Sequence, residues 1–145
     1  MPQRGSAFTF AAGNARKLVA IPLYALGALA TLVTRRDPQS WVVGSGSGLG
    51  EGALPLARLA HDRGHRVTWL ASGERERDSA AALGLPAVLK GSWAGFRATL
   101  RAGVIVVTHG FGDVNRFATR GAFVVQLWHG IPLKRIQLDS PVTFA

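Results

Sequence analysis

The chain has 145 residues, of which 48% are hydrophobic, so we expect one domain with a buried core and not a disordered chain. It contains no cysteine, which excludes disulfides, zinc sites built on thiolates and cysteine nucleophiles. The formal net charge is +9 and is carried mostly by arginine. This balance indicates a polyanionic partner (nucleic acid, an anionic membrane surface or a phosphate-rich substrate) or else the arginine-rich composition of a high-GC genome.

The N-terminal part of the chain contains an uncharged run, Leu18–Thr34, between the basic pairs Arg16-Lys17 and Arg35-Arg36. As a helix it would be apolar on more than one face, which is typical of helices buried in protein or in lipid. It would be roughly 26 Å long, marginal against a hydrocarbon core of about 30 Å, and its basic flanks suit anionic headgroups. We expect a loose arm over residues 1–15, then a helix that lies in the cytoplasmic face of a membrane or packs partly on the domain. A membrane-spanning helix is the alternative.

Short strands alternate with helices from Trp41 onward. Pro55 suits the first turn of a helix, Gly64 suits its end, and Ser92 suits the cap of a later helix. This alternation is typical of a parallel, doubly wound sheet, and we therefore expect a Rossmann-like α/β domain. The predicted strands cover 41–44, 66–71, 87–89, 104–108 and 123–128, and the predicted helices lie within 51–63, around 77–83 and from 92 to 101.

A glycine-rich stretch, residues 44–52, lies between the first predicted strand and the first predicted helix of the domain. Dinucleotide-binding folds place their phosphate-binding turn there. The strict spacing G-x-G-x-x-G fails in every register, however, and only the looser Gly48-x-Gly50-x-x-Ala53 fits. The second predicted strand also lacks the acidic residue at its end that would bind a dinucleotide ribose. We therefore expect a loop whose glycines, Gly46 and Gly48 among them, let a substrate approach the backbone, and we expect no cofactor.

Two of the four histidines follow predicted strands directly. These are His109 and His129, and because ligands bind outside the carboxyl ends of parallel strands, both are expected at one edge of the sheet. We count His109 among the candidate substrate contacts, with a structural hydrogen bond to a loop carbonyl as the other interpretation. His61 and His65 have no further ligand near them in the sequence, so we interpret them as surface and turn residues and expect no metal site.

The segment Gln126–Asp139, which reads QLWHGIPLKRIQLD, closely resembles the signature of the CDP-glycerol glycerophosphotransferase family, a W-H-G-T-P-L-K-[KR] run. Ile131 stands where the family often has threonine, which removes one hydroxyl donor. A weaker resemblance precedes it in the same order: a basic, apolar N-terminal helix, an Arg-Arg-Asp-Pro run and a Trp-Val-Val-Gly-Ser strand. The resemblance covers residues 16–145.

The resemblance implies transfer of glycerol phosphate from CDP-glycerol to a hydroxyl of a membrane-anchored polyol-phosphate polymer or lipid-linked acceptor, with release of CMP, in cell-wall synthesis of the teichoic-acid type. It implies that His129 is the general base, a task that suits an imidazole near neutral pH. Gly130 and the first N–H groups of a helix begun by Pro132 would meet a phosphate. Lys134 and Arg135 would add the positive charge that stabilises phosphoryl transfer.

The fold implied by the resemblance is the N-terminal, acceptor-side lobe of a GT-B enzyme. We expect residues 1–36 to hold the arm and a membrane-associating helix, and residues 37–145 to form the acceptor-side domain. The C-terminal donor lobe is expected to be absent, which would leave the chain inactive alone. The expected partners are CDP-glycerol, the acceptor and an anionic membrane surface at the cytoplasmic face, but not nucleic acid. Two alternatives stay open: a lobe of a GT-B sugar glycosyltransferase, and a non-catalytic membrane-bound binding module.

Overall fold

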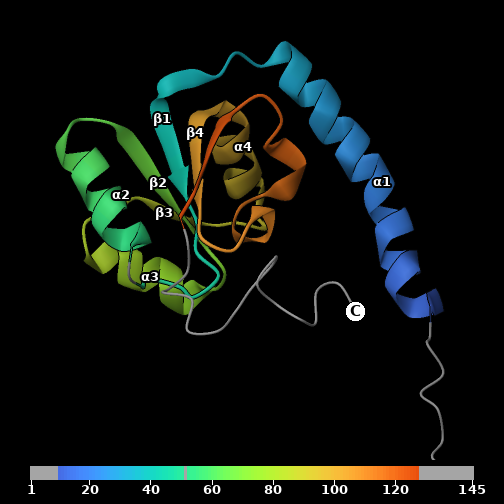
Figure 1. Ribbon diagram of the computed structural model, residues 1–145, viewed down its shortest axis with the longest axis horizontal. Helices are drawn as coiled ribbons and strands as arrows, with labels where there is room; N and C mark the ends of the chain where they lie inside the picture. Colours follow the sequence, from blue (N-terminus) through green and yellow to red (C-terminus); the bar gives the residue numbers. More distant parts are fainter. Residues whose placement is uncertain (1–9, 51, 128–145) are drawn as a thin grey trace, which may run out of the picture.

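The computed structural model describes residues 10–50 and 52–127, which form a parallel sheet flanked by helices (Figure 1). The helices are α1 (Phe10–Val33), α2 (Ala53–Asp62), α3 (Glu74–Ala82) and α4 (Trp93–Arg101), with short 3₁₀ turns η1 (Phe111–Asp113) and η2 (Arg116–Ala118). The strands are β1 (Asp37–Val43), β2 (Arg66–Ala71), β3 (Ala87–Leu89), β4 (Ala102–Val107) and β5 (Phe123–Gln126).

The strands pair in the order β3-β2-β1-β4-β5, and every pairing is parallel. The first three strands, β1, β2 and β3, are each followed by a helix. Each helix returns the chain to the edge of the sheet at which the strands begin, as parallel pairing requires. The order reverses direction between β1 and β4, which is the topological switch point of a doubly wound sheet. The predicted Rossmann-like α/β sheet is therefore confirmed.

Two hydrophobic cores cover the two faces of the sheet, because successive residues of a strand point to opposite faces. In β1, Val43 packs with buried alanines of α2 and α3, whereas Val42 packs in the second core. In β4, Val106 and Ile105 divide in the same way. Both faces are thus closed off, which explains why these strands read as continuous apolar runs.

The ends of the elements follow local signals closely where a cap is present. Ser92 caps α4, with its hydroxyl oxygen accepting the N–H of Gly95 at 3.1 Å. Gly64 ends α2 with a φ of +86°, a conformation that favours glycine. β1, in contrast, begins earlier than predicted, because Asp37 pairs with Ala102 at the start of β4.

Helix α1 begins at Phe10, so the prediction of a loose arm is wrong for residues 10–15, which are helical. Among the described residues, no helix combines the length and apolar character needed to cross a membrane.

Helix α1 runs along one side of the domain and contacts η2 (Figure 1). Gly27 makes this contact possible, since a Cβ there would collide with the carbonyl of Phe117. The ring of Tyr24 meets that of Phe117 edge to face, with centroids 4.7 Å apart.

Arg36 joins the end of α1 to the domain. Its guanidinium donates to the carbonyls of Thr99, Ala102, Ala118 and Arg120, at distances from 2.6 to 3.1 Å. Burial lowers the pKa of Arg36 from its ordinary value. The expectation that the pair Arg35-Arg36 faces lipid headgroups is therefore wrong for Arg36, which fastens the segments before β4 and β5 to the start of β1.

Candidate functional site

The loops after β1 and β4 meet at the carboxyl edge of the sheet, where the strand order reverses. Thr108, the first residue beyond β4, is buried, and its hydroxyl lies 3.2 Å from the hydroxyl of Ser45, which is also buried. The backbone N–H of Gly46 donates to the Thr108 hydroxyl at 3.2 Å. These contacts fasten the glycine-rich loop to the loop that carries His109.

Asp113 holds the loop after β4 in shape. Its buried carboxylate accepts the backbone N–H groups of Thr108, His109 and Gly110 at 2.9, 2.7 and 3.4 Å, and the Thr108 hydroxyl at 3.2 Å. Burial disfavours the charged carboxylate, but the hydrogen bonds from His109, Thr108 and Gly110 outweigh it and lower the pKa of Asp113. The group is therefore a carboxylate at neutral pH.

Sequence reasoning missed Asp113, although it lies only six residues beyond the end of the buried strand β4. The available signal was a short run of glycines around it, His109-Gly-Phe-Gly-Asp113. Such a run suits a tight turn in which an aspartate binds neighbouring backbone N–H groups. An aspartate in a glycine-containing turn is common in proteins. It identifies a site residue only once the glycine-rich loop after β1 is seen to pack against it.

His109 is exposed at the same edge, with Nδ1 2.8 Å from the Thr108 hydroxyl oxygen. Thr108 has one hydroxyl proton. When it donates to Asp113, the short contact to His109 requires Nδ1 to carry a proton and donate in turn. That tautomer leaves Nε2 as the acceptor atom of the ring. The chain Asp113–Thr108–His109 can therefore orient an imidazole at the carboxyl edge.

Gly46 and Gly48 have different surroundings. A Cβ on Gly46 would lie 2.6 Å from Nδ1 of His109 and 3.1 Å from a carboxylate oxygen of Asp113, so a larger residue there would have to displace one of these side chains or the loop. Gly48, which is half-buried, has a φ of +77°, and a Cβ there would meet no atom within 4 Å, so its glycine is explained by the turn conformation alone. Of the two predicted loop residues, the structure brings Gly46 to His109 and leaves Gly48 apart.

The predicted residues His129, Gly130, Lys134 and Arg135 lie outside the described residues. The described chain ends at Leu127, two residues before His129. The backbone N–H of Leu127 donates to the carbonyl of Val107 at 2.7 Å, one residue before Thr108. Leu127, the last described residue before the motif, therefore lies at the carboxyl edge of the sheet, next to the end of β4.

The two remaining histidines form no metal site with other described residues. His61 is exposed on α2. His65 is half-buried and its ring lies against that of Trp41, with centroids 4.9 Å apart, so it is more than the turn residue that we predicted. Over residues 10–50 and 52–127, no group of three or more histidine, aspartate or glutamate side chains is arranged to hold a metal ion.

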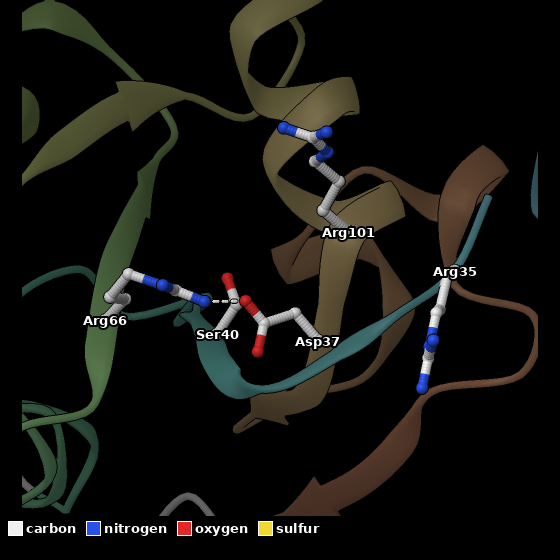
Figure 2. Close-up of a pocket in the computed structure, with 5 residues that line it drawn as sticks. All are labelled: Arg35, Asp37, Ser40, Arg66 and Arg101. Carbon is white, nitrogen blue, oxygen red and sulfur yellow. Dashed lines mark ion pairs between the residues drawn. The ribbon is translucent and has the colours of Figure 1, made fainter.

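Two hollows lie away from the carboxyl-edge network. An apolar groove of about 300 Å³ opens between α1, the start of α4 and η2, and is lined by Leu23, Leu26, Gly91, Ser92, Trp93, Phe96, Asn115 and Phe117. An arginine pocket of about 370 Å³ lies at the amino edge of the sheet and is lined by Arg35, Asp37, Ser40, Arg66 and Arg101 (Figure 2).

Comparison with known proteins identifies the family. Residues 53–143 match the family described as CDP-Glycerol:Poly(glycerophosphate) glycerophosphotransferase. The match runs from α2 through the carboxyl-edge loop and the W-H-G-I-P-L-K-R motif, and it covers more than half of the chain. No curated protein and no solved structure gives a significant match. The chain thus belongs to the CDP-glycerol:poly(glycerophosphate) glycerophosphotransferase family.

Proposed function

We propose that the chain is the acceptor-side part of an enzyme that transfers glycerol phosphate from CDP-glycerol to a polyol-phosphate or lipid-linked acceptor. The acceptor hydroxyl attacks the phosphorus that carries the glycerol. A new P–O bond to the acceptor forms, the P–O bond to the cytidine phosphate breaks, and CMP leaves. The hydroxyl proton passes to a base on this chain.

The family match across the W-H-G-I-P-L-K-R motif is the observation that carries this proposal. The described geometry supports it, because the motif follows a strand whose neighbour ends in the Thr108–His109–Asp113 network. Open parallel sheets bind ligands at that edge, and at the switch point between strands such as β1 and β4. Phosphoryl transfer depends mainly on positioning and charge stabilisation, which a rigid edge of this kind can provide.

The proposed base is His129, because it matches the histidine of the W-H-G-T-P-L-K-[KR] signature to which the sequence resemblance gives that role. Lys134 and Arg135 would meet the phosphate, together with Gly130. In this proposal His109 contacts the acceptor and is held by Thr108, while Gly46 lets the loop lie close to the imidazole. The division of tasks explains why two imidazoles would be used at one edge: one accepts the proton, and the other positions the hydroxyl.

The donor would be held mainly by a second lobe, as in a GT-B enzyme, and catalysis would take place between the lobes. A phosphoryl group in transfer needs charge stabilisation from both sides. We therefore propose that turnover requires a donor-binding lobe in addition to these 145 residues.

We further propose that α1 holds the chain on the cytoplasmic face of a membrane, where a lipid-linked acceptor would be found. Large apolar side chains of α1 are exposed, among them Leu26, Leu29 and Leu32. The apolar groove continues this surface toward Trp93, whose side chain is 74% exposed. Tryptophan is enriched at membrane–water interfaces, and a helix with apolar residues exposed suits insertion into the headgroup region.

The test is an assay of CMP release with the full chain and a co-expressed donor lobe from the same family. We expect CMP release that requires both CDP-glycerol and a lipid-linked glycerol-phosphate acceptor, and none from the chain alone. Turnover of a nucleotide sugar in place of CDP-glycerol would contradict the proposal in favour of a sugar glycosyltransferase. Acceptor binding without turnover of any donor would contradict it in favour of a binding module.

A further inference from the structure

The arginine pocket lies at the opposite edge of the sheet from the carboxyl-edge network. Arg66 begins β2, Asp37 and Ser40 belong to the first half of β1, and Arg101 ends α4. Arg35 connects α1 to β1. The pocket is therefore built from the starts of strands, at the point where α1 reaches the domain, and the proposed reaction does not use it.

Positive charge dominates this pocket. Three arginines and one aspartate line it, and only the Arg66 guanidinium is directed at the Asp37 carboxylate, with which it forms an ion pair (Figure 2). Neither Arg35 nor Arg101 forms an ion pair within residues 10–50 and 52–127. Both are exposed, and Figure 2 shows that their guanidinium groups point away from Asp37, so a ligand would be met by side-chain rotation. Guanidinium groups match phosphate oxygens with paired hydrogen bonds.

The apolar end of α1 adjoins this pocket directly in the chain. Leu32 and Val33 are 69% and 87% exposed, and Arg35 follows two residues after the helix ends. Arg36 cannot serve as a ligand, because its guanidinium is bound to four backbone carbonyls. That anchoring also holds Arg35 beside β1. Apolar and cationic groups therefore meet at one place, as the two parts of a phospholipid do.

We propose that the arginine pocket binds the phosphate of an anionic lipid headgroup while the exposed end of α1 contacts the lipid chains. This proposal rests on the proposed membrane association of α1, and it adds that the lipids bound are anionic. A free phosphate compound shares the headgroup chemistry but lacks the chains that Leu32 and Val33 would contact. The site gives α1 a preference for anionic membranes and fixes the domain at its amino edge.

The experiment measures binding of the full chain to vesicles of phosphatidylcholine, with and without phosphatidylglycerol. The double variant Arg35→Gln with Arg101→Gln keeps the Arg66–Asp37 ion pair, so the fold has no reason to change. One basic residue near an anionic surface strengthens binding roughly fivefold, so the double variant should bind phosphatidylglycerol vesicles about 25-fold more weakly. Binding to pure phosphatidylcholine should not change.

The matched control is the double variant Arg58→Gln with Arg75→Gln, which removes the same charge from exposed positions of α2 and α3. A similar loss in this control would overturn the site, since net charge alone would then explain the preference. Tight binding of inorganic phosphate in the pocket that leaves vesicle binding unchanged would overturn the lipid assignment. Equal binding of the wild type to both vesicles would refute the headgroup site alone, whereas no binding to either would refute the membrane role of α1.

Discussion

The backbone of Gly46 passes so close to the His109 imidazole that a Cβ at position 46 would lie 2.6 Å from Nδ1. The glycine-rich loop after β1 and the histidine loop after β4 are therefore fitted to each other. Thr108 reinforces this fit by accepting the Gly46 N–H and contacting His109. The carboxyl edge of the sheet is thus one packed unit, and a change in either loop should be felt in the other.

Gly46→Ala tests this fit. The added methyl must displace the imidazole or the loop, and overpacking of this kind typically costs about 1–3 kcal/mol of stability. We expect that loss in urea unfolding, with a shifted NMR signal for the His109 ring. Gly50→Ala is the control, because its Cβ would meet no atom closer than 3.9 Å. Equal losses in the two variants would mean that the Gly46–His109 contact has no special weight.

Asp113→Asn tests the carboxylate that holds the loop after β4. The variant keeps the shape but removes the charged acceptor of the buried N–H groups, and we expect a loss of about 1–3 kcal/mol in unfolding free energy near neutral pH. Asp62→Asn, at an exposed position, should change stability by no more than about 0.5 kcal/mol. An Asp113→Asn variant with the same free energy of unfolding as the wild type would show that the network does not stabilise the fold.

The pH dependence of Asp113 has a definite sign. The folded state lowers its pKa, so its stabilising effect is fully present above the unfolded pKa of about 4 and is lost as the pH falls through the folded value. The difference in unfolding free energy between wild type and Asp113→Asn should be constant from neutral pH to about 5 and shrink below about 4. A difference that grows on acidification would contradict the lowered pKa.

Arg36→Lys tests the connection between α1 and the domain. Lysine keeps the charge but cannot reach the four carbonyls that the planar guanidinium serves, so we expect a loss of at least about 1.5 kcal/mol in urea unfolding. Arg35→Lys, in the neighbouring exposed position, should lie within about 0.5 kcal/mol of wild type. The account would be wrong if the two substitutions had the same effect.

Leu29→Gln with Leu32→Gln tests the membrane role of α1. Both leucines are more than half exposed, so the substitutions should leave the fold stable. Loss of a buried apolar side chain costs about 1.5–3 kcal/mol, so binding to phosphatidylcholine vesicles should fall at least tenfold. Leu59→Gln, at an exposed position of α2, is the control and should bind as the wild type does. Unchanged vesicle binding of the double variant would contradict the role of α1.

The strands and the sheet could be predicted from the sequence because their signals are local. Continuous apolar runs such as Val104–Val107 mark buried parallel strands, and Gly64 and Ser92 mark helix ends within a few residues. The position of His109 at the carboxyl edge also followed, since it depends only on where a strand ends. These predictions needed no knowledge of distant contacts.

The parts that were missed depend on residues far apart in the chain. Arg36 reads as half of a basic pair until the carbonyls of Thr99 and Ala118, more than 60 residues away, are brought to it. The special position of Gly46 depends in the same way on His109. The early start of α1 was missed for another reason: residues 10–15 carry no helical period of large apolar side chains, although three of the six are alanine.

The central claim is that His129 accepts the proton of the acceptor hydroxyl, and its most direct test is the kcat of His129→Ala in the chain supplied with a donor lobe. Loss of general-base catalysis typically lowers the rate by about 10²–10⁴-fold, with donor binding little changed. The acidic limb of the pH–rate profile should also disappear, because an imidazole must be neutral to accept a proton. His109→Ala, which removes a positioning contact, should cost much less. A near-normal kcat for His129→Ala, with the same acidic limb, would contradict the account.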